Sequence, residues 1–207
     1  MSVSVVDICN SALYKIGSTR ISSLDEQNKR AIICKDIYSK IRDEVLRAHP
    51  WNFATKRIQL AQETASPTFG YDYQYTLPSD CLRVLGVSYD SSLKTNNRIL
   101  YKIEGNLLLS DETQIYIEYI FKETNTTNYD PNFIEALSFR LAQELAYPIV
   151  QSSELTDRLR QNYREWIADA RTFDGQEGSP QEQMDDTFID SRYFGSYYDE
   201  GVFRETR

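Results

Sequence analysis

The sequence has few of the residues from which active sites are commonly built. His49 is the only histidine among 207 residues, and cysteine occurs three times. The chain contains no GxGxxG, P-loop, GxSxG or HExxH motif, so the common phosphate-binding, nucleophilic and metallopeptidase devices are absent. Cys9, Cys34 and Cys81 form no CxxC pair, which argues against a zinc site or a disulfide framework. We expect three reduced, mostly buried thiols.

Long apolar runs and an excess of basic residues are also missing. No stretch approaches the ~20 apolar residues that a membrane-spanning helix needs. The first residues, MSVSVVDICN, include no basic residue and carry Asp7 in their apolar run, so we expect no signal peptide and synthesis in a cytosol. The net charge of -8 argues against a protein that binds phosphate backbones. An acidic wall would still suit a protein past which DNA slides, because it repels phosphates.

The residues that are present favour a globular protein that assembles with others. The length suits one ordinary domain, or one domain with an elaboration, and the 41% of hydrophobic residues is enough for its core. The 13% of aromatic residues include 15 tyrosines. Tyrosine is enriched at protein interfaces because it has an apolar ring and a hydroxyl group that can form hydrogen bonds. A tyrosine content this high therefore indicates assembly.

Apolar residues recur at helical intervals near both ends of the chain. Gly17 stands where the first helix would have its C-terminal cap, and Pro50 would end the second. In the third, Asp130 is a good N-cap, and a bend or break is expected at Pro148. The predicted helices are 3–16, from about 26 to Pro50, 130–150 and from about 153.

Between these helices, residues 51–122 show the twofold alternation of strands. Tyr71, Tyr73 and Tyr75 would share a face, which is either the inside of the β region or a surface for another subunit. Strands are predicted over 51–62, 71–77, 81–89 and 114–121, with a hairpin over 98–111 that turns at 104–106. The predicted fold is α+β, a bundle of about four helices (1–50 and 123–173) with an inserted antiparallel β module (51–122) and an extended C-terminal tail (174–207).

Residues that could carry chemistry each have a simpler structural interpretation. His49 would interact with the end of its helix rather than act as a base. Trp51 and Phe53 would wedge the first strand against that helix, and Trp166 would lie in the core or at a subunit interface. Three pairs of adjacent acids are expected to be solvated charge. These pairs are Asp25–Glu26, Asp43–Glu44 and Asp185–Asp186.

The end of the chain, FIDSRYFGSYYDEGVFRETR, has six aromatic rings with neither helical nor strand spacing. It follows a linker-like stretch, DGQEGSPQEQ. Segments without a fold of their own are normally poor in aromatic residues. We therefore expect the rings of this tail to bind a partner surface.

Several motifs in a fixed order resemble the head–tail adaptor proteins of tailed bacteriophages, of the tail tubular protein A type. They are HPWNFATKRIQLA, YQYTLPSDCLRVLGV, KIEGNLLLSD with IYIEYI, DPNFIEALSFRLAQELAYPI, and a helix ending DARTFDG. The resemblance runs from about Val5 to Gly175. Its most specific parts are the junction at His49–Phe53 and the run at Leu77–Val84. The C-terminal tail matches only loosely.

The resemblance implies a structural virion protein without enzymatic activity, cofactor or metal. Such a protein forms a dodecameric ring under the portal protein at the head–tail junction, extends the DNA channel, and carries the tail nozzle protein and tail fibres. Viral DNA would pass without specific binding, and no membrane is involved. Aromatic residues of the tail would bury in a groove of the portal or of a neighbouring subunit. These residues are Tyr193, Phe194, Tyr197, Tyr198 and Phe203.

Other functions stay open on the sequence. A cell-wall or polysaccharide hydrolase carried on the tail would use two of the acids, and its mark would be an inward-facing glutamate in an apolar cleft. A small scaffold or connector elsewhere in the particle would share the fold without assembling on the portal. The aromatic tail could also fold back on its own bundle.

Overall fold

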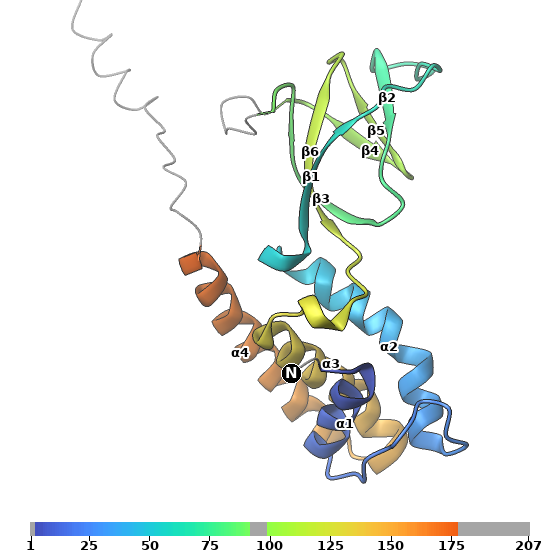
Figure 1. Cartoon of the computed structure of the whole chain (residues 1–207), viewed down its shortest axis with the longest axis vertical. Coiled ribbons are helices and arrows are strands. Elements are labelled where there is room, and N and C mark those ends of the chain that lie inside the picture. Colours follow the sequence, from blue (N-terminus) through green and yellow to red (C-terminus); the bar gives the residue numbers. More distant parts are fainter. Residues whose placement is uncertain (1–2, 92–98, 178–207) are drawn as a thin grey trace, which may run out of the picture. The chain divides into compact units, whose positions relative to one another are not determined.

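The computed structural model describes residues 3–91 and 99–177 (Figure 1). In these ranges the predicted α+β fold is confirmed. Two helices precede the six antiparallel strands along the chain, and two helices follow them. The helices are α1 (Val5–Lys15), α2 (Lys29–Ala48), α3 (Pro131–Val150) and α4 (Ser153–Glu177). The strands are β1 (Thr55–Leu60), β2 (Tyr73–Thr76), β3 (Cys81–Ser88), β4 (Lys102–Glu104), β5 (Leu107–Ser110) and β6 (Ile115–Phe121). No helix in the described ranges is long and apolar enough to cross a membrane.

Both ends of α1 are defined by local hydrogen bonds. Ser4 and Asp7 form a capping box, in which each side chain accepts a hydrogen bond from the backbone N–H of the other residue. At the C-terminal end Gly17 has a positive φ of 70°, as the sequence predicts for a cap. The N–H groups of Gly17 and Ser18 donate to the carbonyls of Tyr14 (3.0 Å) and Leu13 (2.9 Å). This Schellman geometry turns the chain into the loop that leads to α2.

Helix α2 starts later than the predicted residue 26. Its N-cap is Asn28, whose side chain accepts a bond from the N–H of Ala31 (2.9 Å). The Glu26 carboxylate instead accepts bonds from the N–H groups of Ser22 and Ser23, which keeps residues 22–28 in a loop. Side-chain bonding of this kind competes with helix formation.

Of the bend or break expected at Pro148, the break does not occur, because α3 continues through Pro148 to Val150. Proline lacks the N–H that would bond the carbonyl of Glu144, but that position is exposed and only two helical residues follow. Helix α3 ends at Gln151, which has a φ of 58° and donates its N–H to the carbonyl of Tyr147 (2.9 Å). A short turn then leads into α4.

The strand predicted over 51–62 is shorter than expected. Residues Asn52–Ala54 form a 3-10 turn, η1, and β1 begins only at Thr55. The Trp51 side chain is buried, and its indole N–H donates to the carbonyl of Val45 in the last turn of α2 (3.1 Å). This anchor bends the chain back against the helix that it has just left, so a strand cannot start there.

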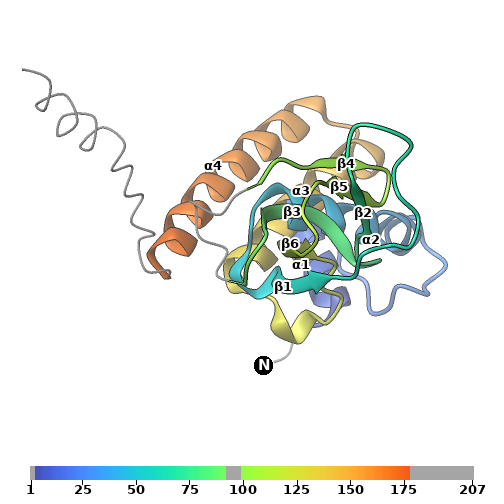
Figure 2. The same cartoon turned by 90° about the horizontal axis from the view of Figure 1, so that it is seen from above.

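The bundle core is centred on α3, which packs against α1, α2 and α4 (Figures 1 and 2). At one end of this core four aromatic rings meet, with centroids 4.8–6.3 Å apart. They are Trp51, Phe53, Tyr129 and Phe133, which come from the two connections between helices and strands and from the first turn of α3. Trp51 is thus anchored to the preceding helix as predicted, whereas the ring of Phe53 contacts Tyr129 and Phe133 before α3 and in its first turn.

The strands form two antiparallel sheets with the orders β1-β6-β3 and β2-β5-β4 (Figure 2). A bridge between Gln62 and Tyr75 links the chain after β1 to the edge of β2. Inner-facing residues of both sheets, among them Ile117 and Leu108, share one core. Among the described residues β3 and β4 each pair on one side only. The predicted hairpin is β4–β5, and Gly105 in its turn has a φ of 62°.

The tyrosine face belongs mainly to the inside of the β module. Tyr75 is fully buried and donates its hydroxyl proton to the carbonyl of Glu112, and Tyr73 packs against the same core. Tyr71 lies before β2, is half-buried and lines a hollow on the outer side. For Tyr73 and Tyr75 the alternative of a subunit surface is therefore excluded in favour of the core.

Candidate functional site

The five residues predicted to bind a partner lie outside the described residues. These are Tyr193, Phe194, Tyr197, Tyr198 and Phe203. Within the described ranges, the candidates are side chains that can do chemistry and surfaces that can receive a partner.

The single histidine has a structural position. His49 is the C-cap of α2, is buried, and lies edge-on to the ring of Trp51 with centroids 4.8 Å apart. Its extended backbone is the conformation that a following proline favours. This agrees with the predicted role at the helix end. Trp166 lies partly buried against the bundle core and donates its indole N–H to the carbonyl of Asn132 (3.0 Å), so it fastens α4 to the start of α3.

Two of the three cysteines, Cys9 and Cys81, are poor nucleophiles in this fold. Cys9 in α1 and Cys34 in α2 are buried neighbours, and a hydrogen bond with Cys34, together with burial, raises the pKa of the Cys9 thiol. Cys81 is half-buried, and burial followed by the charge of Asp80 raises its pKa as well. A raised pKa disfavours the reactive thiolate. Among the described residues, no three of His, Cys, Asp and Glu are grouped to hold a metal ion.

Glu123 is the buried acid of the described residues, in the connection between β6 and α3. Its carboxylate accepts bonds from the N–H of Asn125 and from the side-chain amide of Asn128, both at 2.8 Å. Burial by itself raises the pKa of Glu123, but these bonds, together with a bond from the N–H of Thr124 and the charge of Lys56, outweigh it and hold the pKa below its ordinary value of 4.5. A general acid needs a raised pKa, so Glu123 shapes the connection instead.

Replacing Glu123 with glutamine is expected to lower stability at pH 7 by about 1–2 kcal/mol, since the amide cannot accept both bonds. A depressed pKa contributes stability that is present above the unfolded-state value of 4.5 and lost as the pH falls through the folded-state value. The difference between wild type and Glu123→Gln should therefore shrink below pH 4.5. Urea unfolding at several pH values measures it. A constant difference would contradict the assignment, and the exposed Glu104→Gln is the control.

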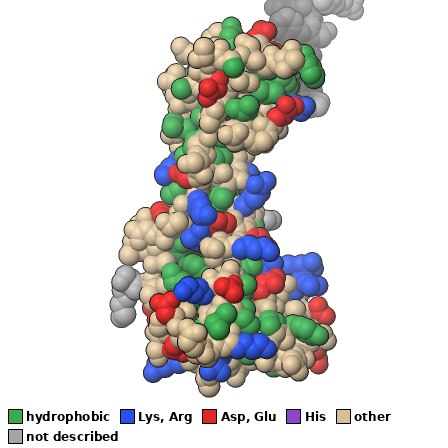
Figure 3. Space-filling model, turned by 90° about the vertical axis from the view of Figure 1, so that its right-hand side faces the viewer, with side chains coloured by type: hydrophobic (Ala, Val, Ile, Leu, Met, Phe, Trp, Pro, Cys, Tyr) green, Lys and Arg blue, Asp and Glu red, His purple; other side chains and the backbone are tan. Residues whose placement is uncertain are grey.

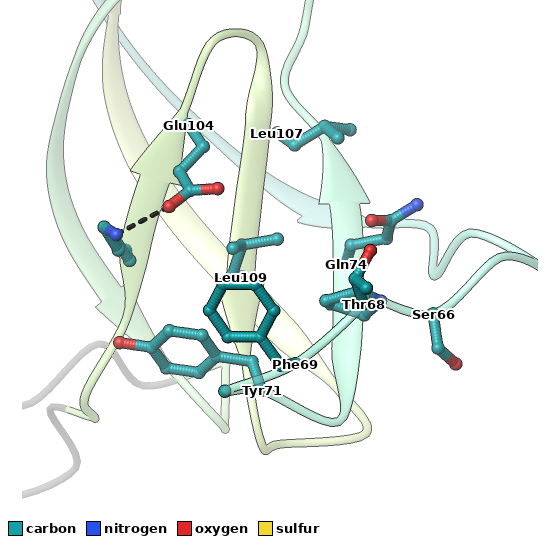
Figure 4. Close-up of a pocket in the computed structure, with 11 residues that line it drawn as sticks. Ser66, Thr68, Phe69, Tyr71, Gln74, Glu104, Leu107 and Leu109 are labelled. Carbon is teal, nitrogen blue, oxygen red and sulfur yellow. Dashed lines mark ion pairs between the residues drawn. The ribbon is translucent and has the colours of Figure 1, made fainter.

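A hollow of about 440 Å³ lies on the outer side of the β2-β5-β4 sheet (Figure 4). Leu107 and Leu109 of β5 form part of its lining, and the loop 66–71 brings Phe69 and Tyr71 beside Leu109 (Figure 4). Phe69 is 86% exposed. The charges at this hollow, Lys102 and Glu104, pair with each other at 2.6 Å. It therefore offers a ligand an apolar surface but no unsatisfied charge.

A second, smaller groove of about 300 Å³ has a different character. It lies between the edge strands β3 and β4, beside the end of α2, and we call it the β3–β4 groove. Its lining comprises Arg47, Leu77, Cys81, Leu82, Arg83, Val84, Ile103 and Gly105. Ile103 is 42% exposed although it is a large apolar residue. An apolar lining with two cationic groups is typical of a site for an apolar ligand that carries negative charge.

The two arginines of the β3–β4 groove are held by backbone carbonyls. Arg47 donates to the carbonyl of Leu82 at the outer edge of β3 (2.7 Å). Arg83 donates to the carbonyl of Arg47 at the end of α2 (3.1 Å), where the helix dipole favours a positive charge. In the described ranges neither guanidinium forms an ion pair with a carboxylate. Because arginine has five N–H donors, most of them remain available to a ligand.

Other charges near the junction of bundle and β module are largely paired. Asp43 of α2 binds both Arg42 and Lys122 at 2.7 Å, and Arg57 binds Glu118 at 2.9 Å. Figure 3 shows basic side chains gathered in the middle of the face that it draws, with acidic ones among them. The β3–β4 groove therefore differs from its surroundings in having cations that form no ion pair with any acid in the described ranges.

Comparison of the sequence with models of known protein families finds no match, and comparison with curated proteins finds none either. Sequence patterns did not reveal the β3–β4 groove, because its residues come from positions 47 to 105 and only folding brings them together.

Proposed function

We propose that this protein is a head–tail adaptor of a tailed bacteriophage, a structural virion protein made in the host cytoplasm. In this proposal it forms a dodecameric ring under the portal protein, extends the DNA channel, and supports the nozzle and fibres of the tail. The observation that carries the proposal is the order of the adaptor-like motifs along an α+β chain whose strands lie between two pairs of helices.

The motifs that resemble those adaptors have definite structural tasks in this chain. The His49–Phe53 segment joins α2 to the β module through the buried indole of Trp51. The Leu77–Val84 run turns the chain from β2 into β3, and the N–H of Leu77 donates to the carbonyl of Asn106 (2.8 Å). Residues with such tasks are the ones that a shared fold would require. This supports a common fold, and the proposed function follows from that fold by analogy.

The charge of the protein suits a channel for DNA. A net charge of -8 repels phosphate groups, so DNA can slide past a ring of such subunits without binding to it. The hydrolase alternative gains no support from Glu123, because that carboxylate is held by hydrogen bonds that lower its pKa. A reducing-sugar assay on highly purified protein tests the hydrolase directly.

Native mass spectrometry with the portal ring of the same phage tests the proposal. The full chain should form a dodecamer on the portal. A variant with alanine at the five predicted aromatic residues, Tyr193, Phe194, Tyr197, Tyr198 and Phe203, should not dock, although its circular dichroism and unfolding temperature stay unchanged. Phe69→Ala removes an exposed ring from the described part of the chain and is the matched control for lost aromatic surface. Absence of portal binding by the full chain would refute the adaptor function.

A further inference from the structure

The β3–β4 groove places specific demands on a ligand. Arg47 and Arg83 each donate one hydrogen bond to a backbone carbonyl, and their remaining N–H groups are available to a ligand. Carboxylates are the natural partners, because charge-assisted bonds from a guanidinium are stronger than neutral ones. The half-buried side chains of Leu77, Leu82 and Val84 call for apolar groups next to those carboxylates. A matching ligand therefore combines two acids with flanking apolar side chains.

A segment of this chain has that composition. Residues 178–207 include seven acidic and three basic residues together with six aromatic ones. Within them, residues 197–203 read YYDEGVF, in which Asp199 and Glu200 are adjacent. Tyr197 and Tyr198 precede the two acids, and Val202 and Phe203 follow them closely. Two carboxylates with apolar neighbours on both sides match the two guanidinium groups and the apolar lining.

We propose that residues 197–203 of one copy dock in the β3–β4 groove of a second copy, with Asp199 and Glu200 on Arg47 and Arg83. This inference rests on the proposed function, because a ring places identical copies side by side. When a segment of one copy binds a groove of the next, the interface is heterologous. Repeated from copy to copy, such an interface can close into a ring. The 19 residues 178–196 can span up to about 60 Å when extended, which is enough to reach a neighbour.

Photo-cross-linking of the full chain tests the docking. Tyr198 is replaced by benzoylphenylalanine, and unlabelled and ¹⁵N-labelled copies are mixed at high concentration before irradiation. Peptide mass spectrometry should find residue 198 joined to the lining of the groove, around Leu82 or Ile103, in pairs of mixed isotope content. Cross-links only within one copy would overturn the second-copy assignment. Cross-links elsewhere, or none, would overturn the groove.

Variants that neutralise charges distinguish docking in the groove from non-specific electrostatic association. Arg47→Gln with Arg83→Gln should reduce the mixed cross-link at least about tenfold, since two charge-assisted bonds are lost. Arg158→Gln with Arg164→Gln removes two exposed cations of α4 and should leave the cross-link unchanged. Asp199→Asn with Glu200→Gln removes the two negative charges without changing side-chain length, so it should reduce the cross-link as much as the groove variant does while the groove itself stays intact. Equal loss in the α4 control would overturn the proposal.

The cross-linking experiment and the portal-binding experiment can fail independently of each other. A dodecamer on the portal without cross-links between copies would overturn this docking and leave the adaptor function standing. Cross-links between copies without portal binding would support this docking and refute the adaptor function.

Discussion

Phe133→Ala is expected to lower the free energy of unfolding by about 3–5 kcal/mol. Phe133 lies in the first turn of α3, is fully buried, and contacts the rings of Trp51, Phe53 and Tyr129 at centroid distances of 5.3, 5.1 and 4.8 Å. Removing the ring leaves a cavity where the bundle meets both connections to the β module. The surrounding rings cannot all move in to fill it, so the lost contacts are not replaced. Urea unfolding followed by circular dichroism measures the change.

Phe69→Ala is the matched control, because it deletes the same side chain at a position that is 86% exposed. It should change the free energy of unfolding by less than about 0.5 kcal/mol. Equal losses in the two variants would show that the aromatic cluster of Phe133 does not carry the expected packing energy.

Ile117→Ala is expected to cost about 2–5 kcal/mol. Ile117 is in the central strand β6, between β1 and β3, and its side chain is fully buried between the two sheets. Its partner in β1 is Ile58, which is 43% exposed because β1 is the outer strand on that side. The same change at Ile58 removes the same atoms from a half-solvated place, so it should cost about 1 kcal/mol.

The contrast between the two paired isoleucines tests the strand order. Urea midpoints of Ile117→Ala and Ile58→Ala, compared at equal unfolding slope, give the two losses. A larger loss at Ile58 would mean that β1, and not β6, is the interior strand.

Much of the local structure could be predicted from the sequence because it depends on neighbouring residues. Gly17 caps α1 and Asp130 caps α3 as predicted, since both act within a single turn. The hairpin turn at Gly105 follows from glycine between two apolar runs. The strand predicted over 114–121 is β6, whose burial alternates from Ile115 to Tyr119, because side chains on a strand point to opposite sides in turn.

Two of the local errors have the same physical cause, which is a competing hydrogen bond that the sequence pattern does not display. The side chain of Glu26 bonds the loop before α2, so the helix begins at Lys29 and not at residue 26. The indole of Trp51 bonds the carbonyl of Val45, so β1 starts only at Thr55. Pro148 looks like a helix breaker but stands where little helix remains to be broken.

By itself the sequence determined the α+β class, the segments that form helices and strands, and the structural roles of His49 and Trp51. Periodicity and capping are properties of short stretches, so they can be read without knowing what packs against them. The tertiary structure alone decided that Arg47 and Arg83 meet at one groove with Ile103, and that Tyr75 lies inside while Phe69 lies outside. Those outcomes depend on contacts between residues distant in the chain, which no local pattern encodes.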